Sequence, residues 1–116
     1  MVFQFVKFEV FIPEEYVDAL REALNDIGAL TIGGNYDSCM SVSKVTGYWR
    51  PLEGADPFNG TVGELCKAEE CKVEFSTRKE LAKEAMKTII KVHPYETPVI
   101  NVLPIINGVG IKELLD

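Results

Sequence analysis

The sequence predicts an α+β fold of the split βαβ, or ferredoxin-like, type, in which two helices cover one face of an antiparallel sheet. Two observations favour it. A strand pattern followed by a helix pattern occurs once in each half of the chain, and each pair is followed by another extended stretch, so the order is β-α-β then β-α-β. The length of 116 residues suits one domain and is too short for two. We therefore expect residues 1–116 to form a single domain.

The first half begins with a predicted strand at Val2–Ile12. Its residues alternate, and one face carries Val6, Phe8, Val10 and Ile12. The other face carries Phe3, Phe5, Lys7, Glu9 and Phe11. Aromatic residues on both faces indicate a central strand, or one that is covered on both sides.

A helix is predicted to follow Pro13, which suits a first helical position because an N–H group there would have no partner in the helix. Glu14 and Glu15 favour the positive end of the helix dipole. Gly28 is the expected end of the helix. The apolar stripe of this helix consists of Val17, Leu20, Leu24 and Ile27.

The second half repeats this layout. Glu70–Phe75 alternates as a strand does, and Thr77 and Glu80 have the spacing of a helix capping box. The helix is expected to end near His93, because the residue before Pro94 is disfavoured in the helical region. Its apolar stripe consists of Leu81, Ala85, Met86 and Ile89.

The remaining segments are less regular. Gly33–Gly63 holds 8 of the 15 glycines and prolines, which is typical of turns and of loops that carry function. Within it, Cys39–Tyr48 alternates weakly and predicts a hairpin or an extended strand. Val99–Ile106 is predicted to be the last strand, and Ile111–Leu115 a short helix that follows two glycine breaks.

The composition disfavours several classes of function. There are 12 Lys and Arg residues against 18 Asp and Glu residues, and the resulting net charge of −6 disfavours binding to nucleic acid. No apolar run approaches the roughly 20 residues that a membrane-spanning helix needs. Met1–Pro13 lacks the basic leader of a signal peptide, so the three cysteines favour a reducing compartment and a cytoplasmic location.

Three stretches resemble known families. His93–Pro98, with the apolar strand Val99–Ile106 after it, resembles the C-terminal part of CutA, the divalent-cation-tolerance family. Gly33–Cys39 and Thr46–Phe58, taken with the His-Pro-Tyr-Glu stretch, resemble the PII/CutA-like domain inserted in YqfO-type proteins. YqfO-type proteins belong to the dinuclear-metal family named after the Ngg-one-interacting factor. The resemblance extends from Lys7 to about Ile105.

This resemblance implies a free-standing version of the inserted domain, with the fold of the ferredoxin-like trimers that sense or bind small ligands. The parent proteins carry their two-metal site on a separate domain with several histidines, and this chain has one histidine. Those metal ligands therefore have no counterpart here. Phe3, Phe5 and Phe11 on an open face of the sheet also predict self-association, which we expect to give a homotrimer.

Two polar segments of the central region are candidates for ligand binding. Tyr36, Asp37 and Ser38 follow a pair of glycines, and they either belong to a ligand loop with exposed N–H groups or bond their own backbone in a tight turn. Arg50 either holds a phosphate or carboxylate through two N–H groups or pairs with a nearby carboxylate of the loop, Glu53 or Asp56.

A third candidate segment surrounds the only imidazole. His93 would act as a base or, together with Glu96, as a metal ligand beside the Tyr95 hydroxyl. The structural alternative is that His93 ends the second helix, where its partial positive charge suits the dipole. Pro94 and Pro98 would then fix the turn into the last strand.

We expect Gly33–Cys39, Gly47–Pro51 and His93–Glu96 to converge, on the expectation that the loops after the two helices lie at the same end of the sheet. The cleft would hold a small anion or a divalent cation, and no other cofactor is predicted. It contains no paired nucleophile and base, so the sequence favours a non-enzymatic, oligomeric binding or regulatory module. The alternative is a small metal-dependent hydrolase related to the YqfO-type family.

Overall fold

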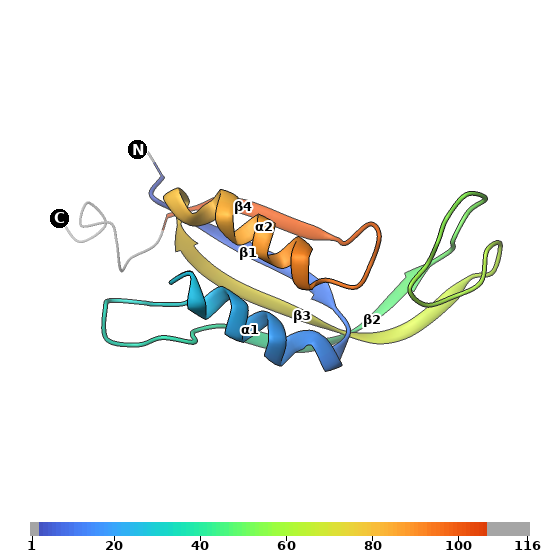
Figure 1. The fold of residues 1–116 in the computed structure, drawn as a ribbon, viewed down its shortest axis with the longest axis horizontal. Coiled ribbons are helices and arrows are strands. Elements are labelled where there is room, and N and C mark those ends of the chain that lie inside the picture. The colour runs from blue at the N-terminus through green and yellow to red at the C-terminus, as the bar shows by residue number, and fades with distance from the viewer. Residues whose placement is uncertain (1–2, 107–116) are drawn as a thin grey trace.

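The structure is a computed structural model that describes residues 3–106. They form a four-stranded antiparallel sheet with the order β2-β3-β1-β4, and both helices lie on one face of it (Figure 1). The predicted ferredoxin-like fold is therefore confirmed. The elements are β1 (Phe5–Ile12), α1 (Val17–Asp26), β2 (Ser41–Trp49), β3 (Cys66–Arg78), α2 (Ala82–Val92) and β4 (Ile100–Ile105). The start of the predicted first strand, the breaks at Gly108 and Gly110, and the predicted helix Ile111–Leu115 lie outside the described residues.

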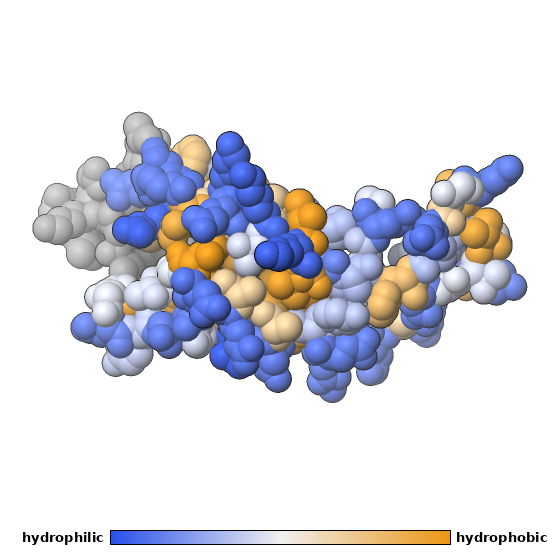
Figure 2. Space-filling view, viewed as in Figure 1, coloured by the Kyte–Doolittle hydropathy of each residue, from blue (hydrophilic) through white to orange (hydrophobic). Residues whose placement is uncertain are grey.

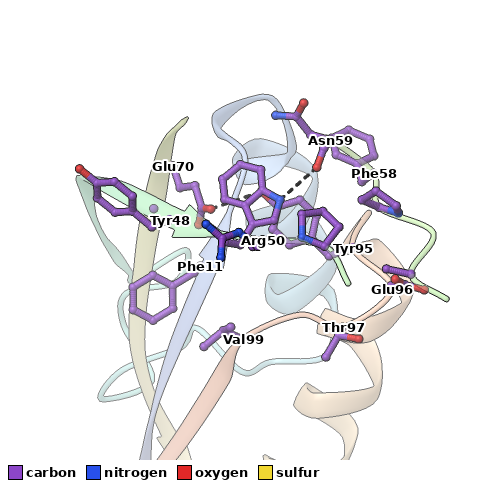
Figure 3. Close-up of a pocket in the computed structure, with 15 residues that line it drawn as sticks. Phe11, Tyr48, Arg50, Phe58, Asn59, Glu70, Tyr95, Glu96, Thr97 and Val99 are labelled. Carbon is purple, nitrogen blue, oxygen red and sulfur yellow. Dashed lines mark hydrogen bonds between the residues drawn. The ribbon is translucent and has the colours of Figure 1, made fainter. Parts of the chain in front are cut away.

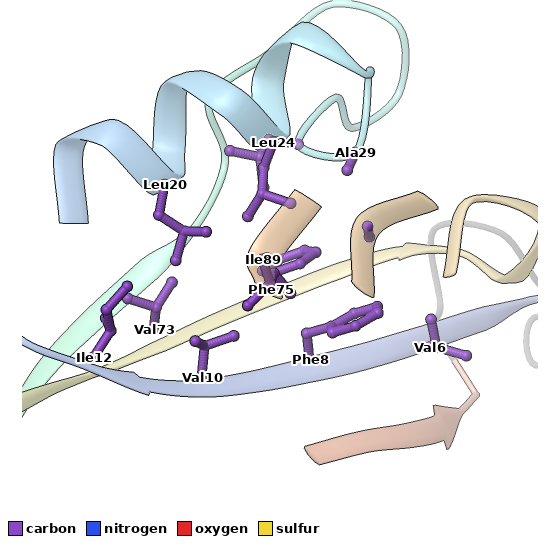
Figure 4. Close-up of a cluster of buried hydrophobic side chains, with 12 residues drawn as sticks. Val6, Phe8, Val10, Ile12, Leu20, Leu24, Ala29, Val73, Phe75 and Ile89 are labelled. Atoms are coloured by element: carbon purple, nitrogen blue, oxygen red, sulfur yellow. The ribbon is translucent and has the colours of Figure 1, made fainter. Parts of the chain in front are cut away.

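The hydrophobic core lies between the helices and one face of β1, which is the central strand and pairs with both β3 and β4 (Figure 4). The face of β1 predicted to be buried is buried. Phe8 stacks on Phe75 of β3, with the two ring centroids 4.9 Å apart. The core consists of Val6, Phe8, Val10, Ile12, Leu20, Leu24, Ala29, Leu30, Val73, Phe75, Ala85 and Ile89.

Both helices begin with a single 3-10 turn, at Glu14–Tyr16 and Lys79–Leu81. The predicted capping box at Thr77 is wrong, because β3 runs on to Arg78 and buries Thr77 opposite Val6. The ends of the helices agree with the prediction: Gly28 follows α1 with φ of +79°, and His93 follows α2 in an extended conformation. Across residues 3–106, neither helix is long and apolar enough to cross a membrane.

The open face of the sheet is mixed, so the expectation of an apolar face is wrong at its centre. Lys7 Nζ lies 2.8 Å from Glu74 Oε1, and Lys72 Nζ lies 3.4 Å from Glu9 Oε2. These two ion pairs occupy the middle of β1 and β3, where Glu9 and Glu74 are directly opposite each other. Two carboxylates directly opposite each other repel and would weaken the pairing of β1 with β3. Lys7 and Lys72 offset that repulsion.

The hairpin formed by β2 and β3 extends beyond the rest of the sheet. β3 has 13 residues and β1 has 8, and Ile12 pairs with Cys71, so residues 66–70 pair with residues 45–49 of β2 alone. We call residues 45–70, which include the connecting loop, the arm (Figure 1). A two-stranded ribbon is marginally stable by itself. The end of the arm exposes apolar side chains (Figure 2), and the exposed apolar residues of its loop include Leu52, Val62 and Leu65.

The core assignment predicts a sharp difference between two adjacent isoleucines of α2. Ile89 is fully buried, whereas 55% of Ile90 is exposed. Ile89→Ala is expected to lower the free energy of unfolding by about 2–5 kcal/mol, because it leaves a cavity. Ile90→Ala is the matched control and is expected to change it by less than about 0.5 kcal/mol. Urea unfolding at equilibrium measures both, and equal losses at the two positions would show that the described face of α2 is not the packed one.

Candidate ligand-binding pocket

A pocket of about 360 Å³ lies where the arm leaves the sheet, between the end of β1 and the turn that joins α2 to β4 (Figure 3). Most of its wall is apolar or aromatic, and a few charged side chains reach it. Pockets of this size and character are typical of small-molecule sites. It is lined by Phe11, Gly47, Tyr48, Trp49, Arg50, Pro51, Ala55, Pro57, Phe58, Asn59, Glu70, Tyr95, Glu96, Thr97 and Val99.

The loop of the arm folds tightly enough to form one wall. The indole Nε1–H of Trp49 donates to the carbonyl oxygen of Asn59 at 3.1 Å. The N–H of Gly63 donates to the carbonyl oxygen of Pro51, a buried residue, at 2.8 Å. Gly60 has φ of +112°, and a Cβ atom there would lie 2.7 Å from the sulfur of Cys66. A glycine is therefore favoured at this position, where the backbone is left-handed and packs against Cys66.

Two contacts hold the loop against the body of the protein. The N–H of Asp56 donates to Glu96 Oε1 at 2.9 Å, which joins segments 40 residues apart in the chain. The ring of Phe58 lies between those of Tyr16 and Tyr95, with both centroid separations at 5.9 Å. Because each contact joins the arm to an element outside it, the pocket depends on the arm being in this position.

Glu70 and Tyr95 form the polar part of the inner wall. Gly47 makes room for Glu70, since a Cβ atom on Gly47 would lie 2.5 Å from its Oε1 atom. The Tyr95 hydroxyl donates to the same oxygen at 3.5 Å, which is a long hydrogen bond. Burial, together with the negative charge of Glu70, raises the pKa of Tyr95 to about 12. The phenol therefore stays protonated at neutral pH and serves as a donor.

Arg50 lines the pocket without an ionic partner among residues 3–106. Neither Glu53 nor Asp56 pairs with it, so the loop-closing interpretation of Arg50 is wrong. Figure 3 shows Arg50 among the aromatic side chains of the pocket. The side chain is exposed, and its five N–H donors are accordingly open to water or to a ligand.

His93 has the structural role rather than the ligand-binding one. Its ring is buried, its Nε2 atom lies 2.6 Å from the carbonyl oxygen of Phe11, and its Nδ1 atom accepts the N–H of Tyr95 at 3.2 Å. These partners require a neutral imidazole with the proton on Nε2. Burial lowers the pKa of His93, and the hydrogen bond to Phe11 opposes that effect only in part. His93 thus ties the turn after α2 to the end of β1.

The expected convergence of three segments is confirmed for two of them and is wrong for Gly33–Cys39. The Gly47–Pro51 segment and Tyr95–Glu96 of the turn meet in the pocket. The Gly33–Cys39 loop lies at the opposite end of the sheet (Figure 1). The reason is topological: β1 and β3 are antiparallel, so the helices that follow them also run in opposite directions and end at opposite ends of the sheet.

Tyr36, Asp37 and Ser38 therefore lie away from the pocket and adopt the tight-turn alternative. The backbones of Tyr36 and Ile32 exchange hydrogen bonds of 2.8 and 3.3 Å. Ser38 has a left-handed φ of +56°, and its N–H donates to the side chain of Asn25 at 2.8 Å. The side chain of Asp37 is exposed and makes no ion pair among the described residues.

Sequence reasoning did not assign Phe11, Phe58 or Glu70 to the site. Phe11 was expected on the open face, which it does occupy, but at the end of that face where the pocket begins. The one available signal was the continued alternation of β3 before Glu70, which would have indicated a hairpin longer than β1. Within residues 3–106, no group of three or more His, Cys, Asp and Glu side chains is arranged to hold a metal ion.

Comparison with known proteins agrees with this architecture. The sequence profile of the CutA1 divalent ion tolerance protein matches residues 61–110. A protein of Halalkalibacterium halodurans named GTP cyclohydrolase 1 type 2 homolog is 41% identical over 101 residues, which cover 87% of this chain and 27% of that protein. The chain thus spans about a quarter of the length of such relatives.

Solved structures show the same relationship. A Bacillus cereus protein related to NIF3 has a TM-score of 0.77 and 33% identity, over 92% of this chain and 27% of that one. CutA of Archaeoglobus fulgidus has a TM-score of 0.67 and 21% identity over 96% of this chain and 91% of that one. Arabidopsis thaliana PII, in a structure with citrate, has a TM-score of 0.60 and 22% identity, over 88% of this chain and 78% of that one. The resemblance to CutA, to PII and to part of the NIF3-related proteins is confirmed.

The buried neutral state of His93 predicts a pH dependence with a definite sign. Because the pKa of His93 lies below 6.5 in the folded protein, the unfolded chain binds the proton first as the pH falls. The free energy of unfolding is therefore expected to decrease as the pH falls from about 6.5 toward the native pKa of His93. His93 is the only histidine, so one imidazole signal in a proton NMR titration reports that pKa directly.

A His93→Gln variant is the control for this titration. Its unfolding free energy should lose the part of the slope that lies between pH 6.5 and the native pKa, while the steeper slope from carboxylates at lower pH remains. A His93 signal that titrates at or above pH 6.5 in the folded wild type would contradict the assignment of a neutral ring.

Proposed function

We propose that this chain is a non-enzymatic module that binds a small ligand in the pocket at the base of the arm and acts as a regulatory unit. One observation carries the proposal: an apolar pocket of about 360 Å³ contains Arg50, a cation without an ionic partner among the described residues. An unpaired guanidinium in an apolar pocket is suited to bind a ligand that accepts hydrogen bonds. The fold shared with CutA and PII is consistent with this function.

The chemistry of the lining residues favours binding over turnover. The single imidazole uses both ring nitrogens in structural hydrogen bonds, and it does not line the pocket. Tyr95 has a pKa of about 12, so its phenol is a poor base near neutral pH. No lining residue is a cysteine or serine that could act as a nucleophile. For these reasons we rank binding above the metal-dependent hydrolase, which would also need ligands that residues 3–106 do not assemble.

Regulation would follow from the position of the arm. The loop of the arm forms part of the pocket wall, and it is held by the Asp56–Glu96 hydrogen bond and by Phe58. A ligand that contacts both the loop and the turn after α2 adds to those contacts and shifts the arm toward its docked position. The apolar end of the arm would then present a surface that depends on the ligand.

We also propose that the chain self-associates, with a homotrimer as the expected form and a cytoplasmic location. Support comes from the exposed apolar side chains at the end of the arm and from the mixed open face, which combines half-buried aromatic residues with ion pairs. Sedimentation equilibrium at micromolar concentration should give three times the chain mass of 12.9 kDa. A mass of 12.9 kDa would contradict self-association.

Trp49 provides a direct test of binding, because it is the only tryptophan and it lines the pocket. Its emission and the melting temperature of the chain are measured against phenylacetate, citrate, inorganic phosphate, phenethylamine, and the chlorides of Mg²⁺ and Zn²⁺. At least one of these probes is expected to shift both signals with a saturable dependence on concentration. A panel that shifts neither signal would contradict the proposed function, and so would turnover of GTP by the purified chain.

A further inference from the structure

We infer that the ligand of this pocket is a small aromatic monocarboxylate, whose ring lies among the aromatic side chains and whose carboxylate binds Arg50. This inference rests on the proposed function, because it names the class of ligand that the same pocket takes. It is carried by three properties of the pocket, namely its walls, the hydrogen bonds that its charged groups have already made, and its overall charge.

The walls favour a flat, apolar body. Phe11, Tyr48, Trp49, Phe58 and Tyr95 contribute five aromatic rings. Aromatic rings bind other rings in stacked or edge-to-face arrangements, which adds to the free energy of burying apolar surface. A cavity of about 150 Å³ is enough for benzene, so about 360 Å³ accommodates one or two rings and a polar group.

The hydrogen bonds favour a ligand with a negative charge. Three charged side chains line the pocket, and two of them are carboxylates. Glu96 accepts the N–H of Asp56, and Glu70 accepts the hydroxyl of Tyr95. Arg50 has no hydrogen bond or ion pair through its side chain to any of residues 3–106. Each carboxylate thus has a donor from the protein, whereas the guanidinium of Arg50 has no protein partner, and its planar set of donors matches the two oxygens of a carboxylate.

The overall charge limits the ligand to one negative charge. Arg50 contributes one positive charge to the lining, whereas Glu70 and Glu96 contribute two negative charges. A carboxylate on Arg50 leaves the repulsion from Glu70 and Glu96 acting on a single charge. A phosphate dianion doubles the repulsion from the two carboxylates and has only one guanidinium to offset it. An aromatic amine is repelled by Arg50 but attracted by Glu70 and Glu96, so its affinity shows directly whether Arg50 or the carboxylates set the preferred charge.

Five probes that share parts of one scaffold separate these contributions. Phenylacetate has the ring and the single negative charge; 2-phenylacetamide has the same shape without the charge; acetate lacks the ring; phenyl phosphate carries a second charge; phenethylamine carries the opposite one. Dissociation constants come from isothermal titration of the full chain and from Trp49 emission. Phenylacetate is expected to bind roughly tenfold or more tightly than each of the others, because a hydrogen bond to a charged group contributes about 1.5–3 kcal/mol.

Two arginine variants test the role assigned to Arg50. Arg50→Gln keeps an N–H donor but removes the charge and shortens the side chain, and it should weaken phenylacetate binding by roughly tenfold or more. Arg78→Gln is the matched control, because Arg78 is exposed at the other end of β3, and it should leave the affinity unchanged. Thermal melting of both variants confirms that they are folded.

The outcomes separate this inference from the proposed function. If phenethylamine, phenyl phosphate or 2-phenylacetamide binds as tightly as phenylacetate, or if Arg50→Gln binds as well as the wild type, the monocarboxylate assignment is overturned while the pocket remains a binding site. If none of the five probes and no member of the wider panel changes Trp49 emission or the melting temperature, the monocarboxylate assignment and the proposed function are both overturned.

Discussion

The unequal lengths of β1 and β3 are the constraint on which the rest of the site depends. β1 ends at Ile12, opposite Cys71, whereas β3 begins five positions earlier at Cys66 and has only β2 to pair with there. The sheet therefore narrows from four strands to two at a step. A helix or a third strand would otherwise cover the side chains at that step. Here the loop of the arm and the turn after α2 enclose them, and the enclosed space is the pocket.

Two hydrogen bonds maintain this arrangement from opposite sides. His93 binds the carbonyl oxygen of Phe11 and fixes the turn after α2 against the last residues of β1. Glu96, three residues further on, accepts the N–H of Asp56 and fixes the loop of the arm against that turn. The first bond is part-buried and comes from a buried imidazole, whereas the second is exposed. Because a buried hydrogen bond is more costly to break than an exposed one, the turn is expected to be rigid and the arm to be the part that moves.

Local sequence patterns predicted the fold well because strand alternation and helical periodicity depend on neighbouring residues. The alternation of β1, the helix end at Gly28 and the turn at His93 were all visible in this way. Contacts between residues far apart in the sequence were not visible in this way. Nothing near Phe58 indicates that it lies between two tyrosines. Thr77 continues the alternation of Val73 and Phe75 and so lies on the buried face of β3, and that signal competed with the capping-box spacing. The loops after the two helices lie at opposite ends of the sheet because β1 and β3 are antiparallel, and the order of elements in the sequence does not by itself reveal that direction. The single domain over residues 1–116 and the cytoplasmic location stay predictions.

Mapping of backbone amide shifts shows whether a ligand binds at the step between the arm and the sheet. The ¹⁵N-labelled chain is titrated with phenylacetate and followed by two-dimensional NMR. The account predicts that the largest shifts occur at Phe11, Gly47–Arg50, Asn59, Glu70 and residues 95–97, and that they saturate together. Shifts centred on residues 33–40 or on the ion pairs of the open face, with none at the step, would contradict it.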